Sequence, residues 1–220
     1  MSSPDSWRQL PKIKTWENRL LDQGCSIEAL EPLNLLRKPG GDLLFALIHA
    51  TGKDPDGIPL LPFALLRGSA CVIVPICRHA SNAERRFLMI RQRRIGHGGL
   101  SLEFPAGMLD DDPDPLATAL RELAEETGIV VTREDLVPLW DKELFSSPGL
   151  TDESIHFFTV EVKLSDEAWQ ALEGQKRGEA EEGEQLTTTL ATFSEASKEL
   201  TSLQALMGFL LYFRRFGEIT

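Results

Sequence analysis

The middle of one stretch of the chain, residues 107–129, carries helix signals at both of its ends. Asp114 is suited to cap a first turn, Pro115 suits the first helical position, and Gly128 is a typical helix stop. Five apolar residues between these ends repeat at helical spacing and form one stripe: Leu116, Ala119, Leu120, Leu123 and Ala124. The stretch therefore predicts an amphipathic helix that packs against a core.

The opposite face of this helix carries three glutamates, Glu122, Glu125 and Glu126. Glu122 and Glu126 repel each other as an i,i+4 pair, and the helix dipole disfavours anions in the last turns. The arrangement costs roughly 1 kcal/mol or more unless something neutralises it. A hard divalent cation would do so, because Mg²⁺ prefers carboxylate oxygens and keeps waters and phosphates as other ligands. A solvated acidic face is the alternative interpretation.

The residues around these glutamates resemble the Nudix box, G-x5-E-x7-R-E-U-x-E-E-x-G-U, where U is aliphatic. The matching positions are Gly107, Arg121, Glu122, Leu123, Glu125, Glu126, Gly128 and Ile129. Pro113 stands where the pattern has glutamate, and Asp112 or Asp114 would only partly replace that carboxylate. The resemblance implies the Nudix fold from about Arg67 to the end, an α+β fold in which a mixed sheet lies between helices (an α/β/α sandwich).

The composition is that of an ordinary globular protein. Of 220 residues, 42% are hydrophobic and 26% charged, which suffices for one large domain or a small domain beside a medium one. The net charge of −11 argues against a nucleic-acid partner, which needs a basic surface. No apolar run is long enough to span a membrane, and the first residues lack the apolar segment of a signal peptide. We therefore expect neither nucleic acid nor membrane as a partner.

The cysteines indicate a reducing compartment. Cys25, Cys71 and Cys77 are odd in number and form no C-x-x-C motif. We expect them to be reduced and mostly buried, in a cytoplasmic protein. No histidine is placed by sequence to activate one of them as a nucleophile.

The N-terminal part, residues 1–66, is expected to form a separate β-rich region. A short helix within 6–23 precedes strands at 26–38 and 42–50 and a third apolar segment at 58–66. Because so few strands bury little apolar surface on their own, we expect the region to pack on a larger partner or on a second copy of the chain.

The remainder, residues 67–220, is the expected Nudix domain. Strands are predicted at 69–77, 86–92, 100–104, 136–144, 154–164 and 186–190, and further helices at 166–172, 194–200 and 203–216. The last helix places five residues at core spacing: Leu203, Leu206, Met207, Leu210 and Leu211. Residues 174–183 read as a charged loop.

Segments outside the box resemble Nudix enzymes that cleave ADP-ribose and other ADP-sugars. The run 102–107, LEFPAG, is similar to their E-x-P-A-G segment, which implies Glu103 as a metal or substrate ligand and the Ala106 carbonyl as a metal ligand. Residues 92–94 resemble the Q-x-R segment, which implies that Arg94 binds substrate. Arginine suits this task because its planar fork binds phosphate oxygens bidentately. A solvated strand edge is the alternative for both residues.

Later segments extend this resemblance. Ser147-Pro148-Gly149 is similar to the S-P-G segment behind the box, which implies Ser147 and Gly149 as substrate-binding residues; alone it would indicate a plain turn. Residues 179–186 resemble the loop that brings a last acidic residue to the site. This implies Glu184 as catalytic base, with Glu182 as the second choice.

The N-terminal part of the resembling enzymes builds a homodimer and supplies aromatic rings that stack on adenine. Trp16 is our candidate for this stacking and Trp7 the alternative, although buried anchoring of the N-terminal layer fits each ring as well.

Together these features predict a hydrolase that uses Mg²⁺, with Mn²⁺ as a substitute. It would split the diphosphate bond of ADP-ribose or an ADP-sugar into AMP and a sugar phosphate. Glu103, Glu122, Glu126 and the Ala106 carbonyl would hold the metal, with Glu125 as a further ligand or catalytic partner. Arg121 would orient these glutamates by ion pairing. The alternatives are another Nudix substrate, such as a damaged nucleoside triphosphate or GDP-mannose, and a module that senses nucleotides without cleaving them.

Overall fold

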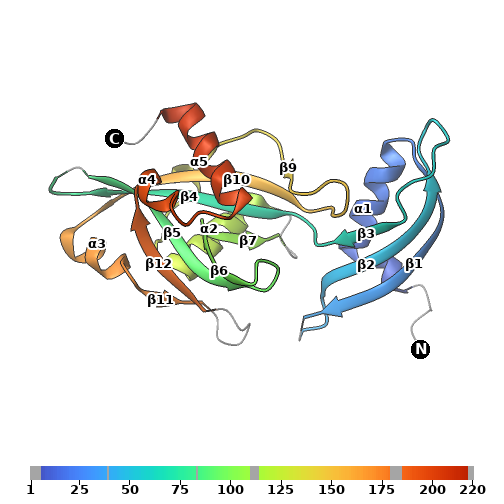
Figure 1. The fold of residues 1–220 in the computed structure, drawn as a ribbon, viewed down its shortest axis with the longest axis horizontal. Helices are drawn as coiled ribbons and strands as arrows, with labels where there is room; N and C mark the ends of the chain where they lie inside the picture. The colour runs from blue at the N-terminus through green and yellow to red at the C-terminus, as the bar shows by residue number, and fades with distance from the viewer. Residues whose placement is uncertain (1–5, 39, 83, 110–113, 179–184, 218–220) are drawn as a thin grey trace. The chain divides into compact units, whose positions relative to one another are not determined.

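The chain divides into two compact units. The computed structural model describes residues 6–38, 40–82, 84–109, 114–178 and 185–217. The first unit comprises Met1–Ser69 and Phe145–Ser154, and the second Ala70–Leu144 and Ile155–Thr220 (Figure 1). The segment 145–154, far along the chain, thus belongs with the N-terminal residues.

The first unit is a three-stranded antiparallel sheet with a helix against it. Strand β2 (Leu43–Lys53) lies between β1 (Ser26–Arg37) and β3 (Phe63–Leu66), and helix α1 (Pro11–Asp22) follows the 3₁₀ turn η1 (Ser6–Gln9). The expected helix and first two strands are confirmed, whereas the third strand is shorter than the apolar run 58–66. The small core consists of Trp7, Ile13, Leu43, Ala46, Ile48 and Leu66.

Two acidic residues of the segment 145–154 bind it to Arg67 and Gly68 of the same unit. The buried Asp152 carboxylate accepts hydrogen bonds from the backbone N–H groups of Arg67, at 2.7 Å, and Gly68, at 3.1 Å. The Arg67 guanidinium lies 2.8 Å from the Glu153 carboxylate, which also accepts a hydrogen bond from Ser146. Buried charges are stable only when they are paired in this way.

The second unit is built on a mixed sheet. The strand order is β11-β12-β5-β4-β10-β8, with β6 beside β5 and β7 beside β4. In the described residues β4 and β10 run parallel, whereas the pairs β11–β12, β12–β5, β5–β4, β5–β6, β4–β7 and β10–β8 are antiparallel. The bounds are β4 Ala70–His79, β5 Arg85–Arg94, β6 Gly99–Glu103, β7 Ala106–Met108, β8 Val137–Pro138, β10 Ser154–Leu164, β11 Lys176–Arg177 and β12 Leu186–Ala191.

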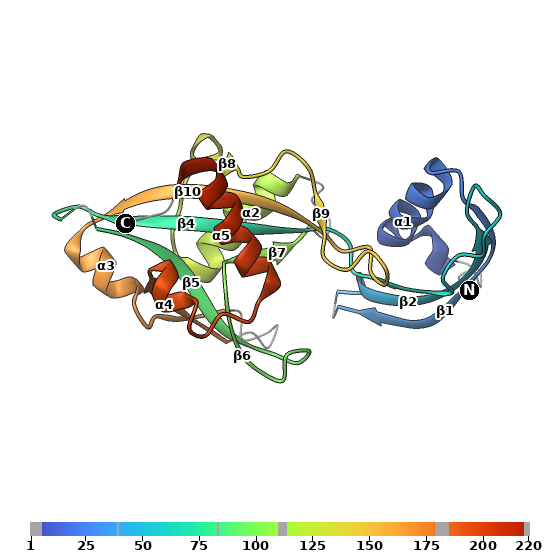
Figure 2. The same cartoon turned by 45° about the horizontal axis from the view of Figure 1, so that its top comes forward.

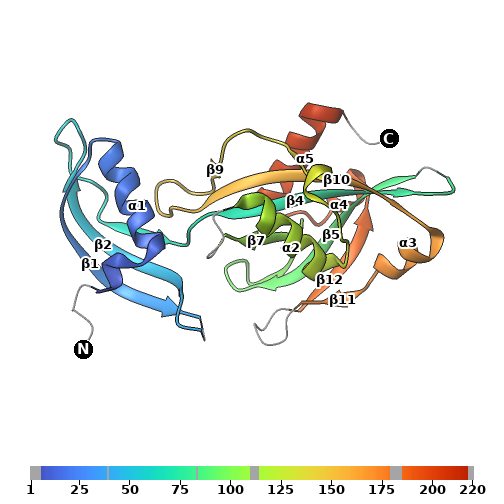
Figure 3. The ribbon, with the colours of Figure 1, turned by 180° about the vertical axis from the view of Figure 1, so that it is seen from behind.

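Helices cover both faces of this sheet. Helices α2 (Pro115–Thr127) and α3 (Asp166–Leu172) lie on one face, and α4 (Phe193–Ala196) and α5 (Leu203–Phe216) on the other (Figures 2 and 3). Alternate residues of β4 enter the two cores: Val72, Val74 and Ile76 pack beneath α5, and Cys71, Ile73 and Cys77 pack beneath α2. The predicted α/β/α sandwich is confirmed, because a strand buried on both faces needs a layer on each.

Helix α5 exists as predicted, and two of its five expected core residues are confirmed: Leu211 is buried and Met207 packs against the core. The expectation is wrong for the other three. Leu203, Leu206 and Leu210 are exposed, while Gly208 and Phe209 face the sheet. A Cβ on Gly208 would lie only 2.9 Å from the Phe104 ring, so the missing side chain allows close approach. Aromatic packing then sets the helix rotation, since Phe209 contacts Phe87 at 4.7 Å between ring centroids.

Two other expected elements are shorter than predicted, and one expected loop contains a short strand. The strand expected at 136–144 is reduced to β8 and the two-residue β9 (Leu144–Phe145), because Pro138 has no N–H to continue a ladder. The loop expected at 174–183 contains the short strand β11, and the helix expected at 194–200 is only α4.

No helix in the described part of the chain has the length and apolar character needed to cross a membrane.

Candidate active site

Helix α2 has the capping that its sequence predicts. The Asp114 carboxylate accepts a hydrogen bond from the Leu116 N–H at 3.0 Å, and Pro115 occupies the first turn. Gly128 adopts the left-handed conformation, with φ of 76°, and its N–H donates to the Ala124 carbonyl. With its ends fixed and Leu123 fully buried, the helix presents its glutamates in a defined orientation.

The three glutamates of α2 differ strongly in exposure. The Glu125 side chain is 39% exposed and that of Glu122 14%, whereas Glu126 is 5% exposed as a residue. The Glu126 carboxylate accepts a hydrogen bond of 3.0 Å from the backbone N–H of Ala106, in β7. The expectation that all three lie on a face away from the core is therefore wrong for Glu126.

Glu122 also reaches strand β7. A Cβ placed on Gly107 would lie 1.9 Å from a carboxylate oxygen of Glu122, so this side chain occupies the space that glycine leaves free. Glu122 and Glu126 thus bring two carboxylates against consecutive residues, Gly107 and Ala106. This arrangement explains physically why the box needs glycine at position 107.

Arg121 pairs with the two more accessible glutamates. Its guanidinium lies 2.6 Å from Glu122 and 2.7 Å from Glu125. Partial burial opposes the charge on Arg121, but these two carboxylates outweigh it and hold its pKa above the usual value. The like-charge repulsion expected on this face is thereby partly neutralised within the helix itself.

The β5–β6 hairpin brings Arg94 and Glu103 together. The Arg94 guanidinium donates from Nη2 at 2.8 Å and from Nε at 3.2 Å to the buried Glu103 carboxylate. Arg93, the next residue, is exposed. The sequence indicated separate tasks for Arg94 and Glu103, and their direct pairing was not foreseen. The strand register, with Ile90 opposite Glu103 and Arg94 opposite Gly99, places both side chains on one face of the hairpin, and the long Arg94 side chain spans the distance between them.

The oxygen groups near β7 suit a hard cation, although they do not form a complete site. In the described part of the chain, no three His, Cys, Asp or Glu side chains are grouped so that they could hold a metal ion. Glu103 is engaged by Arg94, which leaves Glu122 and Glu126 as the carboxylates beside β7. Two carboxylates and a backbone carbonyl are the ligand type that Mg²⁺ uses when waters and phosphates complete its coordination.

The predicted substrate residues Ser147, Gly149 and Trp16 belong to the first unit. The Ser147 carbonyl accepts hydrogen bonds from the N–H groups of Leu150 and Thr151, both at 3.0 Å, which makes a tight turn. Trp16 is partly buried against the N-terminal core. Their participation in one site with the α2 glutamates stays a prediction.

The predicted bases Glu182 and Glu184 lie outside the described residues. The two ends of their segment are described: Arg177 pairs with Leu186 between β11 and β12. A Cβ on Gly128 would lie 2.2 Å from the Arg177 guanidinium, so this cation sits at the C-terminal end of α2, where the helix dipole favours it. The sequence predicted a loop over 174–183 and gave no signal for this position of Arg177, which depends on the pairing of β11 with β12.

The thiols of Cys71 and Cys77 are poorly suited to nucleophilic chemistry. Cys71 and Cys77 are free and fully buried, and burial raises the pKa of each thiol to about 12. A thiol with such a pKa holds almost no thiolate near neutral pH and is a poor nucleophile.

Comparison with known proteins agrees with this geometry. A family model described as NUDIX domain matches residues 70–203. The chain is 33% identical over 191 residues to "Nudix hydrolase 14, chloroplastic" of Arabidopsis thaliana, covering 83% of this chain and 60% of that protein. It is 32% identical over 112 residues to the ADP-sugar pyrophosphatase of Mus musculus, covering 51% of this chain and 49% of that protein. Thus the chain spans about half to three fifths of these relatives.

A crystal structure of an ADP compounds hydrolase has a similar fold. Its TM-score is 0.58 at 18% identity, with 88% of this chain and 96% of that chain covered. At this identity the likeness concerns the fold.

Proposed function

The chain belongs to the Nudix family, and on that premise we propose that it hydrolyses the diphosphate bond of ADP-ribose or an ADP-sugar. The products would be AMP and a sugar phosphate. The observation that carries the proposal is the convergence of Glu122 and Glu126 on strand β7. The names of the mouse ADP-sugar pyrophosphatase and of the ADP compounds hydrolase support this substrate class.

A divalent cation, Mg²⁺ or in its place Mn²⁺, is part of this proposal. Glu122, Glu126 and the Ala106 carbonyl would hold it, with Glu103 and Glu125 as further ligands. When bound, such a cation neutralises phosphate charge and lowers the pKa of a water ligand. The ion pairs of Arg121 keep Glu122 and Glu125 oriented while the carboxylate of Glu126 is held by the Ala106 amide.

Arg94 would bind the diphosphate with its planar guanidinium. It is paired with Glu103, so substrate phosphate would compete for the same N–H donors. Glu184, or else Glu182, would accept the proton of the attacking water. Ser147, Gly149 and Trp16 are proposed to contact the substrate.

We further propose a homodimer formed by the N-terminal strands. Apolar side chains of the first unit support it, since Leu33 and Leu36 of β1 and Phe63 of β3 are about half exposed. Nucleic acid and membranes are not expected as partners, and a cytoplasmic location stays a prediction from the cysteine pattern.

One experiment tests the proposed activity. The protein is incubated with a panel of ADP-ribose, ADP-hexoses, GDP-mannose and oxidised nucleoside triphosphates, with Mg²⁺, with Mn²⁺ or with chelator, and the products are identified by mass. Release of AMP and sugar phosphate supports the proposal. Turnover of another substrate alone identifies a different Nudix specificity, and binding without turnover identifies a nucleotide sensor.

A further inference from the structure

A basic pocket lies beneath the C-terminal end of α5, apart from the α2 glutamates. Its cavity of about 660 Å³ is lined by residues 138–142 and by Leu211, Arg214 and Arg215. We propose that this pocket binds a small phosphorylated molecule through Arg214, Arg215 and Lys142. The proposal is independent of the activity proposed above.

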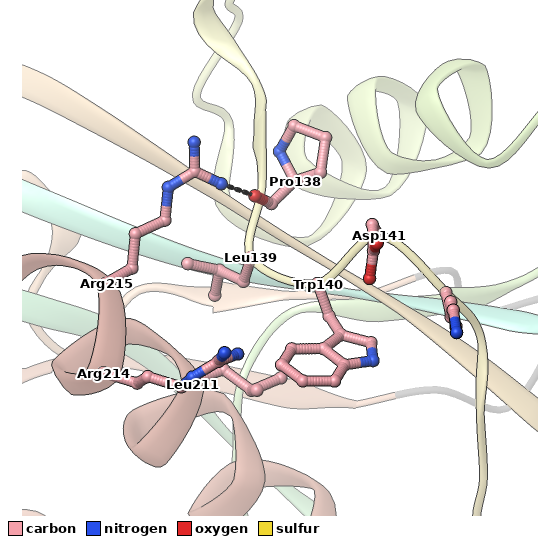
Figure 4. Close-up of a pocket in the computed structure, with 8 residues that line it drawn as sticks. Pro138, Leu139, Trp140, Asp141, Leu211, Arg214 and Arg215 are labelled. Atoms are coloured by element: carbon pink, nitrogen blue, oxygen red, sulfur yellow. Dashed lines mark hydrogen bonds between the residues drawn. The ribbon is translucent and has the colours of Figure 1, made fainter.

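Trp140 holds the Arg214 guanidinium in place. The guanidinium carbon lies over the indole ring, 4.4 Å from its centroid, and both side chains line the pocket (Figure 4). A guanidinium stacked on an aromatic ring keeps its N–H donors in a fixed plane. No group in the described ranges accepts a hydrogen bond from Arg214, so its donors remain available to an anion. Such a fixed fork matches the oxygens of a phosphate.

The other two cations come from both sides of the pocket. Arg215, from α5, donates a hydrogen bond to the carbonyl of Pro138 (Figure 4), which uses one of its donors and fixes its position. Lys142, from the segment after β8, has no ion-pair partner within the part of the chain that the structure describes. Asp141 is the acidic residue of the lining. Three cations against one carboxylate are a local excess in a chain of net charge −11.

The helix dipole does not account for this arrangement. Cations in the last turn of α5 favour the helix, which explains why arginines stand at 214 and 215. It explains neither the stacking on Trp140 nor the presence of Lys142 on another segment. The cavity has the size of pockets that hold small organic ligands, so a sugar phosphate or nucleoside monophosphate would fit.

The pocket is separate from the candidate active site. Leu139 and Leu211 of its lining belong to the core beneath α5, whereas α2 packs on the other face of the sheet. A ligand in the pocket therefore does not share the carboxylates of Glu122 and Glu126. This separation allows the two sites to be tested individually.

The test measures phosphate binding to the full-length protein by calorimetry. The buffer contains a chelator, so that no metal ion can link phosphate to Glu122 and Glu126. Inorganic phosphate and AMP are the two probes. We expect saturable millimolar or tighter binding that Arg214→Ala weakens about tenfold or more, the range for a charge-assisted hydrogen bond. Lys142→Ala should weaken it less, and Lys198→Ala, which removes the same charge from an exposed site, should leave it unchanged.

Each outcome decides the proposal. Tighter binding of AMP than of phosphate, with the same loss in Arg214→Ala, identifies a nucleotide as the ligand; equal affinities identify the phosphate group alone. Equal binding by wild type, Arg214→Ala and Lys142→Ala overturns the proposal, as does an absence of saturable binding to the wild type. Because the Lys142 ammonium makes no ion pair in the described structure, Lys142→Ala keeps the test valid if Arg214→Ala unfolds.

Discussion

The backbone N–H of Ala106 donates a hydrogen bond of 3.0 Å to the carboxylate of Glu126, twenty residues further along the chain. This bond ties the last turns of α2 to strand β7 and keeps a buried carboxylate next to the proposed metal position. Burial of an acidic group is costly unless it is paired. The Ala106 amide offsets part of this cost, and such specific support for a buried carboxylate favours a functional role for Glu126.

Replacing Glu126 with glutamine should remove activity while keeping the fold. The glutamine carbonyl oxygen can accept the same hydrogen bond from Ala106, but the neutral amide lacks the negative charge that would bind the cation. We expect turnover to fall by orders of magnitude at saturating Mg²⁺, with little change in melting temperature. Glu134→Gln, at an exposed position outside the box, is the control. Near-normal turnover of Glu126→Gln would show that the ligand assignment is wrong.

Gly107→Ala should displace Glu122. The new Cβ would overlap the Glu122 carboxylate and also its Cγ, which would lie 2.2 Å away, so the whole side chain would have to turn aside. We expect a loss of stability of about 1–3 kcal/mol, the range for overpacking, together with a large fall in kcat. Gly96→Ala is the matched control, because its Cβ would meet no atom within 4 Å. If both variants kept wild-type kcat, the position of Glu122 over Gly107 would be unimportant for activity.

Arg94 and Arg93 should differ in their effect on substrate use. Arg94→Ala should weaken kcat/KM for an ADP-sugar by roughly 1.5–3 kcal/mol, the range for hydrogen bonds to charged groups. Arg93→Ala should change little, because this neighbouring side chain is exposed and makes no ion pair in the described structure. Steady-state kinetics of both variants checks this, and equal losses would disprove the assignment of Arg94.

Asp152 should give the protein a recognisable pH dependence. Burial raises the pKa of its carboxyl above the usual value, against hydrogen bonds from Arg67 and Gly68 that lower it. The folded state then binds the proton more tightly than the unfolded state, so this group's contribution to stability falls as pH rises from about 4 to its folded pKa. Asp152→Asn keeps an acceptor without the charge. Its melting temperature relative to wild type should therefore rise with pH across this window; a constant or decreasing difference would contradict the raised pKa.

The proposed dimer can be tested by light scattering of the full-length protein at micromolar concentration. We expect twice the monomer mass. Leu36→Glu would place a charge on the half-exposed face of β1 and should shift the protein toward monomer. Ile95→Glu, at a fully exposed position of the second unit, should not. A fully active wild-type monomer would refute the claim.

Local sequence signals determined the bounds of α2, the central strand β4 and the placement of the three glutamates on one helix. The caps at Asp114 and Gly128 define α2 because each acts within a few residues of its own position. The apolar run at 69–77 predicted the central strand β4 because burial on both faces demands it. The spacing of Glu122, Glu125 and Glu126 likewise placed the three carboxylates on neighbouring positions of one helix.

Only the tertiary structure decided which of these groups are buried and what they contact. The bond between Glu126 and Ala106, the pairing of Arg94 with Glu103 and the position of Arg177 at Gly128 all join residues brought together by the sheet. The leucine stripe of α5 shows the same limit, since Gly208 and the aromatic rings, rather than apolar spacing, set the helix rotation. Burial depends on what packs against a side chain from elsewhere in the chain, and local periodicity does not contain that information.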